Sequence, residues 1–536
     1  MATGTGAEEY VEGFGEVSKT AGTVFRYLLL GATLFGIVMV TIFLVYIAND
    51  AIQPLTADPG WHLVFFCTLV VPTLAVSGYL AWRNRAALSA GTAAIGLFVV
   101  SLMFGAGIAM VFVDIVPPIT WFGYVLALVL PLAAATGIER LDRRLPFLAR
   151  FAVLGTLLVG SVLVVPDLVG TYLTSLTGAT FLDLSFGAPI ALAVGVYAER
   201  RSKSRRTSIA AGGAAFLVVF VSGFVGPFVG LTAVPATVLA AVAIVPTATY
   251  VRTVLSKPQR RIGLLVPAVM LGGALVGAFV VESVGFAGPD SWVDWQFLTS
   301  PHSSSSAAEA GFYPAIGGSI VMMLIVAVLS FPLGVGTAVY LEEYAPDNRF
   351  TRIIDVNISN LAGVPSVVYG LLGLGLFVTY LGRSPGTALI GGATLGLLIL
   401  PIVIISAREA IRSVPDSMRQ ASYGMGATRW QTVKNVVLPR AFPGILTGTI
   451  LALGRAIGET APLIMIGAPN VLYSLPSSLE ASVSAMPLQV FAWATLFASE
   501  EFYTKAVPAG IVVLLVILLA MNSVAIVLRN KYQRES

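Results

Sequence analysis

The chain has 536 residues, of which 57% are hydrophobic and 11% charged, with a net charge of +4. Soluble globular proteins carry about 25% charged residues, so this composition excludes that class and predicts an all-α protein that crosses a membrane many times. The modest net charge gives no reason to expect a nucleic-acid partner. A single cysteine, Cys67, excludes an intrachain disulfide, and two histidines far apart in sequence give no reason to expect a metal site.

Apolar stretches of spanning length recur along the whole chain and predict about fourteen transmembrane helices. The first eight expected spans are 25–47, 61–82, 88–113, 119–138, 147–168, 181–198, 209–229 and 234–250. The last six are 262–282, 315–341, 358–381, 387–405, 444–467 and 506–528. The polar start of the chain lacks the basic beginning and short apolar core of a cleaved signal peptide, so the first span is expected to remain as a membrane anchor.

Basic residues gather in every second expected loop. These loops lie at 83–85, 140–144, 200–206 and 252–261, whereas the loops between them carry Asp50, Asp58, Asp114 and Asp167. The positive-inside rule therefore places both termini in the cytoplasm. The basic tail 529–531 agrees, because an even number of spans returns the chain to its starting side.

A polar stretch at 252–262 that contains Pro258 divides the expected helices into two groups. We expect a cytoplasmic N-terminal tail at 1–22, an eight-helix membrane domain at 23–255 and a second membrane domain at 256–536. The eight-helix domain carries almost no ionisable residue at membrane depth, and its role is not indicated. On the outer side, the tryptophans of the irregular stretch 288–313 are expected at the membrane interface, and its serine run 303–306 is expected to be a flexible linker. The segment 475–505 is either an interfacial or re-entrant piece or an ordinary loop.

Two opposite charges, Arg455 and Glu459, lie near the middle of the expected span 444–467. A charge at that depth costs about 2.5–3.5 kcal/mol on insertion scales, so such residues are commonly functional. Four residues apart, they share one helix face. The guanidinium offers a planar fork of donors that can bind the oxygens of an anion, and the carboxylate can accept a hydrogen bond from a protonated group. The alternative is an ion pair that only locks two helices together. Pro462 is expected to break the helix just outward of the pair, as a transport site or a simple kink.

The expected cytoplasmic loop 408–439 has the pattern of two short helices joined by a turn. Pro415 suits the first turn of a helix that includes 420–422, and Gly426 permits a sharp turn. A second short helix from Thr428 is expected to end before Pro439. The pattern predicts a helix–turn–helix knob that fits a groove on a partner, or an ordinary solvated loop.

These motifs resemble those of ABC importer permeases. The spacing from Gln420 through Gly426 to a Leu-Pro pair is similar to the "EAA" loop of that family, with Gln420 in place of the usual glutamate. The stretches YLEEYAP at 340–346, LAGVPSVVYG at 361–370 and RAIGETAPL at 455–463 are similar to the PstA family of phosphate importer permeases. The resemblance runs from Ile262 to the C-terminus and implies that the loop couples to a separate ATPase through Gln420, Ala421, Ser422, Gly426, Leu438 and Pro439.

The same resemblance implies a type I ABC importer domain of six helices, with its transmembrane core at about 313–528. The eight leading helices are not part of that pattern. It further implies that phosphate passes Arg455, Glu459 and Thr460. The implied partners are a PstC-like second permease, an ATPase dimer that holds ATP and Mg, an extracellular phosphate-binding protein and membrane lipid.

The expected function is therefore that of the permease subunit of an ATP-driven phosphate importer in the cytoplasmic membrane. No Gly-x-x-x-x-Gly-Lys-Ser/Thr phosphate loop occurs in the sequence, so the chain is not expected to be an enzyme or to hold a cofactor itself. Two alternatives remain. One is a permease for another oxyanion, such as sulfate or molybdate, and the other is an ATP-independent secondary carrier or membrane sensor.

Two further sets of residues stand out near the cytoplasmic side. Gly363 and Pro365 are expected to interrupt the span 358–381, for gating, substrate lining or packing. Glu342 and Glu343 lie at the inner end of their helix, and we expect them to be solvated or to contact the ATPase.

Overall fold

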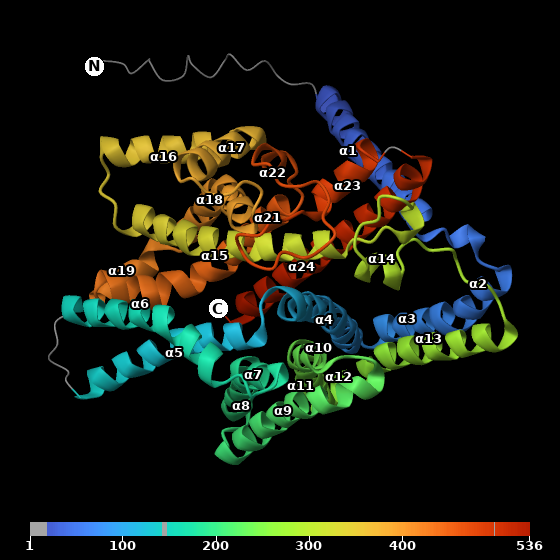
Figure 1. Cartoon of the computed structure of the whole chain (residues 1–536), viewed down its shortest axis with the longest axis horizontal. Coiled ribbons are helices and arrows are strands. Elements are labelled where there is room, and N and C mark those ends of the chain that lie inside the picture. The colour runs from blue at the N-terminus through green and yellow to red at the C-terminus, as the bar shows by residue number, and fades with distance from the viewer. Residues whose placement is uncertain (1–18, 142–146, 498, 536) are drawn as a thin grey trace, which may run out of the picture.

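The computed structural model describes residues 19–141, 147–497 and 499–535, and these residues fold into helices (Figure 1). Within them, twelve helices are long and apolar enough to cross a membrane, or thirteen if a helix pair bent at 363–365 counts as one span. A further expected span contains a shorter apolar helix, Pro118–Ala134. The prediction of an all-α protein that crosses the membrane many times is confirmed, with a count close to the expected fourteen. Residues 1–18 of the predicted tail, together with Arg143 and Arg144, lie outside the described residues.

The front half of the chain, residues 19–255, consists of long helices, several of which contain a wide, π-type turn. Such turns lie at Phe66–Val70, Val111–Ile115, Asp183–Gly187 and Ala240–Ile244, and each leaves the helix axis continuous. The helices are α1 (Lys19–Ile52), α2 (Pro59–Phe65), α3 (Val71–Arg83), α4 (Arg85–Met110), α5 (Pro118–Leu141), α6 (Phe147–Tyr172), α7 (Gly178–Leu182), α8 (Ala188–Ser202), α9 (Arg205–Val225), α10 (Ala233–Leu239) and α11 (Val245–Leu255).

The second half of the chain, residues 256–535, is arranged around α18. In the apolar stretch of this helix, 67% of the residues are buried. Helix α15 packs along one side of α18, α21 packs along another, and α24 packs on α21 (Figure 1). The helices are α12 (Pro258–Arg261), α13 (Leu265–Val284), α14 (Trp295–Thr299), α15 (Tyr313–Glu343), α16 (Arg349–Ala362), α17 (Ser366–Gly373), α18 (Ala388–Arg412), α19 (Asp416–Gly424), α20 (Arg429–Thr432), α21 (Leu438–Ala456), α22 (Ala461–Met465), α23 (Met486–Thr495) and α24 (Val507–Glu535).

The two halves are in contact at several places. Helix α13 packs against α2, α3 and α4, and α1 lies along α24. The approach of α13 is very close, because a Cβ atom at Gly273 would lie 2.1 Å from the carbonyl oxygen of Thr68. The domain boundary at 255–256 stays a prediction from the sequence, and the helix that follows it is packed on the front half.

The outer connections of the second half form a folded cap. Phe297, Phe312 and Trp493 are buried against one another, with ring centroids 5.3–5.8 Å apart. Trp493 Nε1 also donates a hydrogen bond to Nδ1 of the buried His302, at 3.1 Å. Apolar burial thus holds Phe297, Phe312 and His302 in place, whereas Trp295 is exposed. The flexible linker expected at 303–306 stays a prediction. The segment 475–505 contains the buried helix α23 rather than an ordinary loop.

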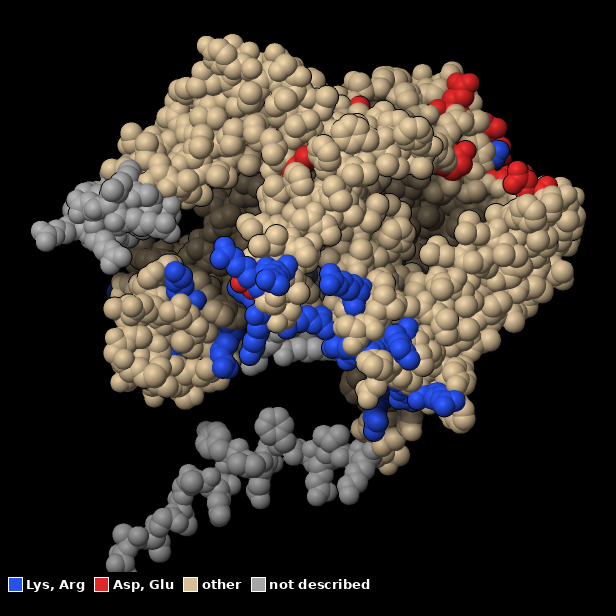
Figure 2. All heavy atoms as spheres, turned by 90° about the horizontal axis from the view of Figure 1, so that it is seen from below, with Lys and Arg blue, Asp and Glu red and all other residues tan. Residues whose placement is uncertain are grey.

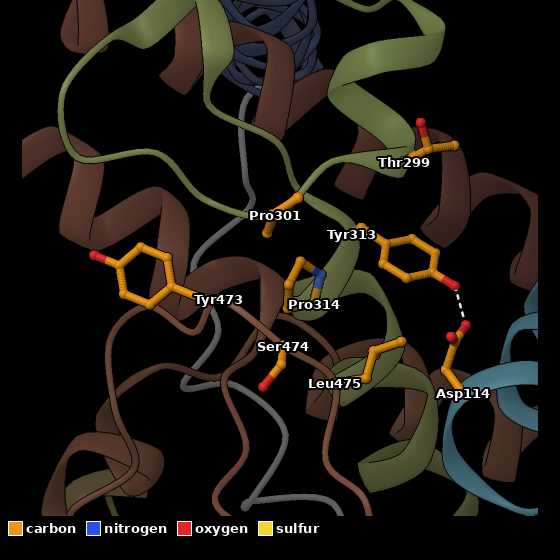
Figure 3. A pocket seen from close by; sticks show the side chains of 8 residues that line it. All are labelled: Asp114, Thr299, Pro301, Tyr313, Pro314, Tyr473, Ser474 and Leu475. Atoms are coloured by element: carbon orange, nitrogen blue, oxygen red, sulfur yellow. Dashed lines mark hydrogen bonds between the residues drawn. The ribbon is translucent and has the colours of Figure 1, made fainter.

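A cavity of about 420 Å³ opens beside this cap where the two halves meet (Figure 3). Tyr313, at the start of α15, donates a hydrogen bond to Asp114 in the wide turn Val111–Ile115 that follows α4, and this bond ties the second half to the front half. The cavity is lined by Asp114, Thr299, Pro301, Tyr313, Pro314, Tyr473, Ser474 and Leu475. None of the predicted phosphate-pathway residues is among them.

Charged side chains are unevenly distributed over the surface. Figure 2 shows Lys and Arg gathered in one region of the molecule and most Asp and Glu in another. This separation agrees with the alternation of basic and acidic loops along the sequence. The placement of both termini in the cytoplasm stays a prediction.

Candidate functional site

The helix that carries Arg455 ends one residue later, at Ala456, and a non-helical turn at 457–460 separates it from α22. Arg455 Nε lies 3.4 Å from Glu459 Oε1 across this turn. The prediction that both charges lie near the middle of one helix is therefore wrong. The expected break outward of the pair is also wrong in position, because the chain breaks at the pair itself.

Pro462 explains where the break falls. In a continuous helix, a proline at this position would clash with the carbonyl group of Gly458 and would leave it without a hydrogen bond. In the structure, Pro462 instead occupies the first turn of α22, where no intrahelical N–H donor is needed. Pro462 therefore favours an end of α21 before residue 458 rather than requiring it, because Pro332 and Pro401 lie inside continuous helices of the same chain. Arg455 lies in the last turn of α21.

Arg455 and Glu459 differ in exposure. The Arg455 side chain is 48% exposed and that of Glu459 is 16% exposed. Leu451, Arg455 and Gly458 form an exposed stripe at the end of α21. The guanidinium is therefore exposed at the surface of this chain, and the less exposed Glu459 carboxylate holds it through the ion pair. A cation also suits this position because the C-terminal end of a helix carries partial negative charge.

Thr460 lies in the same interrupted segment. Its carbonyl oxygen accepts hydrogen bonds from Leu463 N and Ile464 N, both at 3.1 Å, and so begins α22. The structure thus brings the three predicted pathway residues, Arg455, Glu459 and Thr460, into one break between two helices.

A second broken helix lies beside the first. Helices α16 and α17 are bent by 106° where they meet at 363–365, which confirms the predicted interruption by Gly363 and Pro365. Tyr369 bridges this break, because its hydroxyl donates a hydrogen bond to the carbonyl oxygen of Leu361 at 2.8 Å. Helix α17 packs on α22, so the two breaks are neighbours. Paired interruptions of spanning helices commonly form transport sites. Their proximity was not predicted, because the two segments are far apart in sequence.

The contact between α17 and α22 depends on Gly370. A Cβ atom at this position would lie 2.8 Å from Pro462 Cα and 2.7 Å from Met465 Cβ. We expect Gly370→Val to separate the two broken helices and to lower stability by about 1–3 kcal/mol, because overpacking forces the backbone to shift. Thermal unfolding measures this effect. Gly375→Val is the control, since a Cβ there would have nothing within 4 Å. Equal melting temperatures for the two variants would contradict the packing argument.

The predicted helix–turn–helix knob is present and is here defined as residues 416–432, comprising α19, a turn and α20. Gly426 has a φ angle of +82°, which confirms the sharp turn that only glycine adopts without strain. Thr428 caps α20 and forms a reciprocal capping box with Gln431. Ser422 is buried, and its hydroxyl lies 2.8 Å from that of Thr432, so this predicted coupling residue joins the two helices of the knob.

The outer surface of the knob is partly apolar. Met425 is 83% exposed and Trp430 57% exposed, and they lie on either side of the Gly426 turn. Gln420 and Ala421 are exposed as well. The two large apolar residues were not predicted, although their positions beside the turn were visible in the sequence.

The second helix of the knob does not end before Pro439, so that prediction is wrong. A wide turn at Val433–Val437 shifts the hydrogen-bond pattern, and Leu438 N donates to the carbonyl oxygen of Val433. The extra residue in this turn lets the helix pass Pro439 without the usual clash. One continuous helix of 28 residues therefore runs from Arg429 to Ala456. At 1.5 Å per residue it connects the knob to Arg455 over about 42 Å.

An ion-pair network fixes the knob to the bundle. Arg419 of α19 donates to Glu343 at the end of α15 (3.0 Å) and to the carbonyl oxygens of Ile411 and Val414. The exposed fractions of the side chains are only 14% for Arg419 and 5% for Glu343. Glu343 is therefore neither solvated nor free to contact an ATPase, contrary to expectation. The inner ion-pair network comprises Glu342, Glu343, Asp355, Arg408, Arg412 and Arg419.

The rest of the network ties α15, α16 and α18 together. Arg408 of α18 lies 2.8 Å from Glu342 of α15 and 2.7 Å from Asp355 of α16. Arg412 lies 2.7 Å from Glu342 as well. Glu342 is 15% exposed, so the expectation of a solvated carboxylate is wrong here too. The neighbouring acidic and basic clusters were visible in the sequence, but their pairing was not.

Comparisons with known proteins agree with this arrangement. The family model for the binding-protein-dependent transport system inner membrane component matches residues 330–531. The phosphate transport system permease protein PstA of Xylella fastidiosa (strain 9a5c) is 32% identical over 231 residues, which cover 42% of this chain and 78% of that protein. The chain belongs to this family of ABC importer permeases. The predicted resemblance is confirmed, and the matched residues of the permease include the knob and both broken helices.

Two other relatives of the permease match a smaller share of their own length. The probable ABC transporter permease protein YqgI of Bacillus subtilis (strain 168) is 39% identical over 37% of this chain and 65% of that protein. The phosphate transport system permease protein PstA 1 of Mycobacterium tuberculosis (strain CDC 1551 / Oshkosh) is 38% identical over 34% of this chain and 59% of that protein. The chain therefore spans about three-fifths of the length of these curated relatives.

Proposed function

We propose that this chain is the membrane permease subunit of an ATP-driven importer of inorganic phosphate in the cytoplasmic membrane. The observation that carries the proposal is the Arg455–Glu459 pair at the break between α21 and α22. The printed names of its relatives support phosphate as the substrate, because several are phosphate transport system permeases.

Phosphate passes between this chain and a PstC-like second permease. The exposed stripe of Leu451, Arg455 and Gly458 suits such an interface, because Arg455 is then presented to the space between the two permeases. The guanidinium binds phosphate oxygens in a fork, and Glu459 accepts a hydrogen bond from a protonated phosphate. Sulfate carries no such proton at neutral pH, so its oxygens are repelled by the Glu459 carboxylate. With no anion present, Glu459 offsets the charge of Arg455. Thr460 offers a hydroxyl at the same break.

Energy comes from a separate ATPase dimer, which holds ATP and Mg. The knob docks on it through Gln420, Ala421 and Gly426, with Met425 and Trp430 as apolar anchors. Closure of the ATPase moves the knob, and the helix from Arg429 to Ala456 carries the motion to Arg455. The knob and both termini are cytoplasmic, and an extracellular phosphate-binding protein delivers phosphate to the opposite face.

Uptake by the reconstituted complex tests this function. Labelled phosphate is supplied with its binding protein to proteoliposomes that contain both permeases and the ATPase, with ATP inside or absent. We expect uptake that requires ATP and persists in an excess of sulfate or molybdate. Equal competition by either anion would assign the permease to another oxyanion, and uptake without the ATPase would make it a secondary carrier.

The turn of the knob offers a second test. Gly426→Ala is expected to strain the backbone by about 1–2 kcal/mol, because a residue with a Cβ atom rarely adopts a positive φ. A Cβ there has nothing within 4 Å, so the effect is one of conformation alone. We expect less ATPase to co-purify with this variant. Gly424→Ala, also with open space around its Cβ but with an ordinary helical backbone, should retain the ATPase. Equal recovery with both variants would remove the turn from the docking site.

A further inference from the structure

A buried carboxyl group that has one oxygen without a partner lies inside the front half. Asp183 is 4% exposed, and its Oδ1 has no hydrogen-bond partner among the described residues. It begins the wide turn Asp183–Gly187, within the candidate span Gly178–Ser202. The front half thus contains a buried ionisable residue within a candidate membrane span, near its outer end, and ionisable residues within such spans are commonly functional.

The packing of the neighbouring residues shows which way Asp183 faces. A Cβ atom at Gly223 of α9 would lie 3.6 Å from Ala179 Cβ, one turn before Asp183. A Cβ atom at Gly187, one turn after Asp183, would lie 3.0 Å from Val219 Cγ1 of α9. Residues one helical turn apart share a face, so Asp183 is directed at α9 between Val219 and Gly223.

A second buried polar group without a partner among the described residues lies on α10, beside the same stretch of α9. Thr237 of α10 is 0% exposed, and its Oγ1 has no hydrogen-bond partner in the described part of the chain. That oxygen lies 3.2 Å from the position of a Cβ atom at Gly223. Buried hydroxyls in helices usually bond to a carbonyl one turn back, as Ser185 does to Phe181 at 2.6 Å. The Thr237 hydroxyl makes no such bond among the described residues, so it is available to a ligand beside Gly223 of α9.

The helices packed around Asp183 have no basic residue at the same depth as its carboxyl group. Helices α5, α8, α9 and α10 pack against α7 or the Asp183–Gly187 turn. Asp114, which lies at the outer end like Asp183, is hydrogen-bonded to Tyr313. An unpaired carboxylate in an apolar interior is strongly unfavourable, so the site requires one positive charge. The other charged residues of these helices lie toward the opposite, inner ends: Glu139, Arg140, Glu199, Arg200, Arg201, Arg205 and Arg206.

We propose that Asp183 and Thr237 bind a small monovalent cation, either a proton or Na⁺. One carboxylate balances one charge, and oxygen donors suit hard cations. A divalent ion is disfavoured, because the described residues contain no group of three His, Cys, Asp or Glu that could hold one. The bound cation makes the packing of α7, α9 and α10 depend on the pH or on the Na⁺ concentration. This gives the front half a cation-sensing site that is independent of the phosphate pathway.

Thermal unfolding of the purified full-length chain in lipid nanodiscs tests the site. The melting temperature is measured from low to high pH, in K⁺ buffers with and without Na⁺. If the ligand is a proton, the melting temperature of the wild type falls by several degrees as the pH rises, whether or not Na⁺ is present. If it is Na⁺, the addition of Na⁺ raises the melting temperature at high pH and the same amount of K⁺ does not. Infrared difference spectra distinguish the cases by the band of a protonated carboxyl group.

Variants isolate the contribution of this site from that of other titrating groups. Asp183→Asn keeps the shape of the side chain and removes its charge. The part of the melting-temperature change that depends on the bound cation should therefore be lost in this variant. Thr237→Val should weaken that part, and Asp167→Asn, at an exposed position of α6, should leave it unchanged. A response of Asp183→Asn identical to that of the wild type at every pH and Na⁺ concentration would overturn the proposal.

Discussion

Replacing Arg455 with alanine is expected to abolish phosphate uptake while leaving the permease folded and assembled. The guanidinium is 48% exposed and contacts only Glu459 among the ion pairs of the described residues, so its loss removes little packing. The variant also removes the proposed contact between Arg455 and phosphate. Truncating one partner of a hydrogen-bonded charge pair in a dehydrated contact costs about 2–5 kcal/mol, so uptake should fall about 30-fold or more. Uptake of labelled phosphate into proteoliposomes measures the effect, and co-purification of the second permease and the ATPase reports assembly.

Two matched variants make this result specific. Arg383 lies in an exposed ion pair with Glu480, at 3.1 Å, and Arg383→Ala should transport phosphate normally. Arg455→Lys keeps the charge but loses the planar fork, so its uptake should be intermediate. Normal uptake by Arg455→Ala would remove this residue from the mechanism. A complex that no longer assembles would instead support the alternative that the pair only locks helices together.

Features set by local sequence were predicted well. The apolar spans, the sharp turn at Gly426 and the interruption at Gly363 and Pro365 each follow from a few neighbouring residues, and the structure contains them. The errors also have a physical pattern. Both misplaced helix ends, near Pro439 and Pro462, involve a proline whose effect depends on the hydrogen-bond register before it. A wide turn absorbs Pro439, whereas Pro462 begins a new helix.

Features set by contacts between distant segments could not be predicted. In the sequence, Glu343 and Arg419 are each ordinary charged residues of a helix. They become a buried ion pair only because the fold places α19 next to the end of α15. The same holds for Asp183 and Thr237, whose lack of partners appears only once α7, α9 and α10 are in place. In this chain the sequence therefore predicts the apolar spans and the glycine turn better than it predicts which charges become buried.

The buried pair gives the knob a rigid connection to the membrane helices. Arg419 holds Glu343 and two carbonyl groups at the end of α18, while the helix from Arg429 to Ala456 leaves the other side of the knob. A force on the knob thus reaches α15 and α18 through the contacts of Arg419, and it reaches Arg455 through the continuous helix. If the Arg419 connection were cut, α19 could rotate on the partner ATPase without moving the bundle.

Arg419→Ala is therefore expected to lower the free energy of unfolding by about 3–5 kcal/mol, because it leaves the buried Glu343 carboxylate unpaired. Thermal unfolding measures the loss. Asp416→Ala is the control, since Asp416 also pairs with Arg419, at 3.1 Å, but is 86% exposed. Its loss should change stability by less than about 1 kcal/mol. Equal effects of the two variants would contradict the assignment of Glu343 as the partner that matters.

The double exchange Arg419→Glu with Glu343→Arg separates pairing from mere packing. It restores an opposite-charge pair at the same place, so it should recover part of the stability that Arg419→Ala loses. The assembled complex gives a readout that a structural role alone would not change, namely the phosphate transported per ATP hydrolysed. We expect Arg419→Ala complexes that still assemble to hydrolyse ATP with little transport, because the knob no longer moves α15 and α18. An unchanged ratio in such complexes would show that force passes through the continuous helix to Arg455 alone.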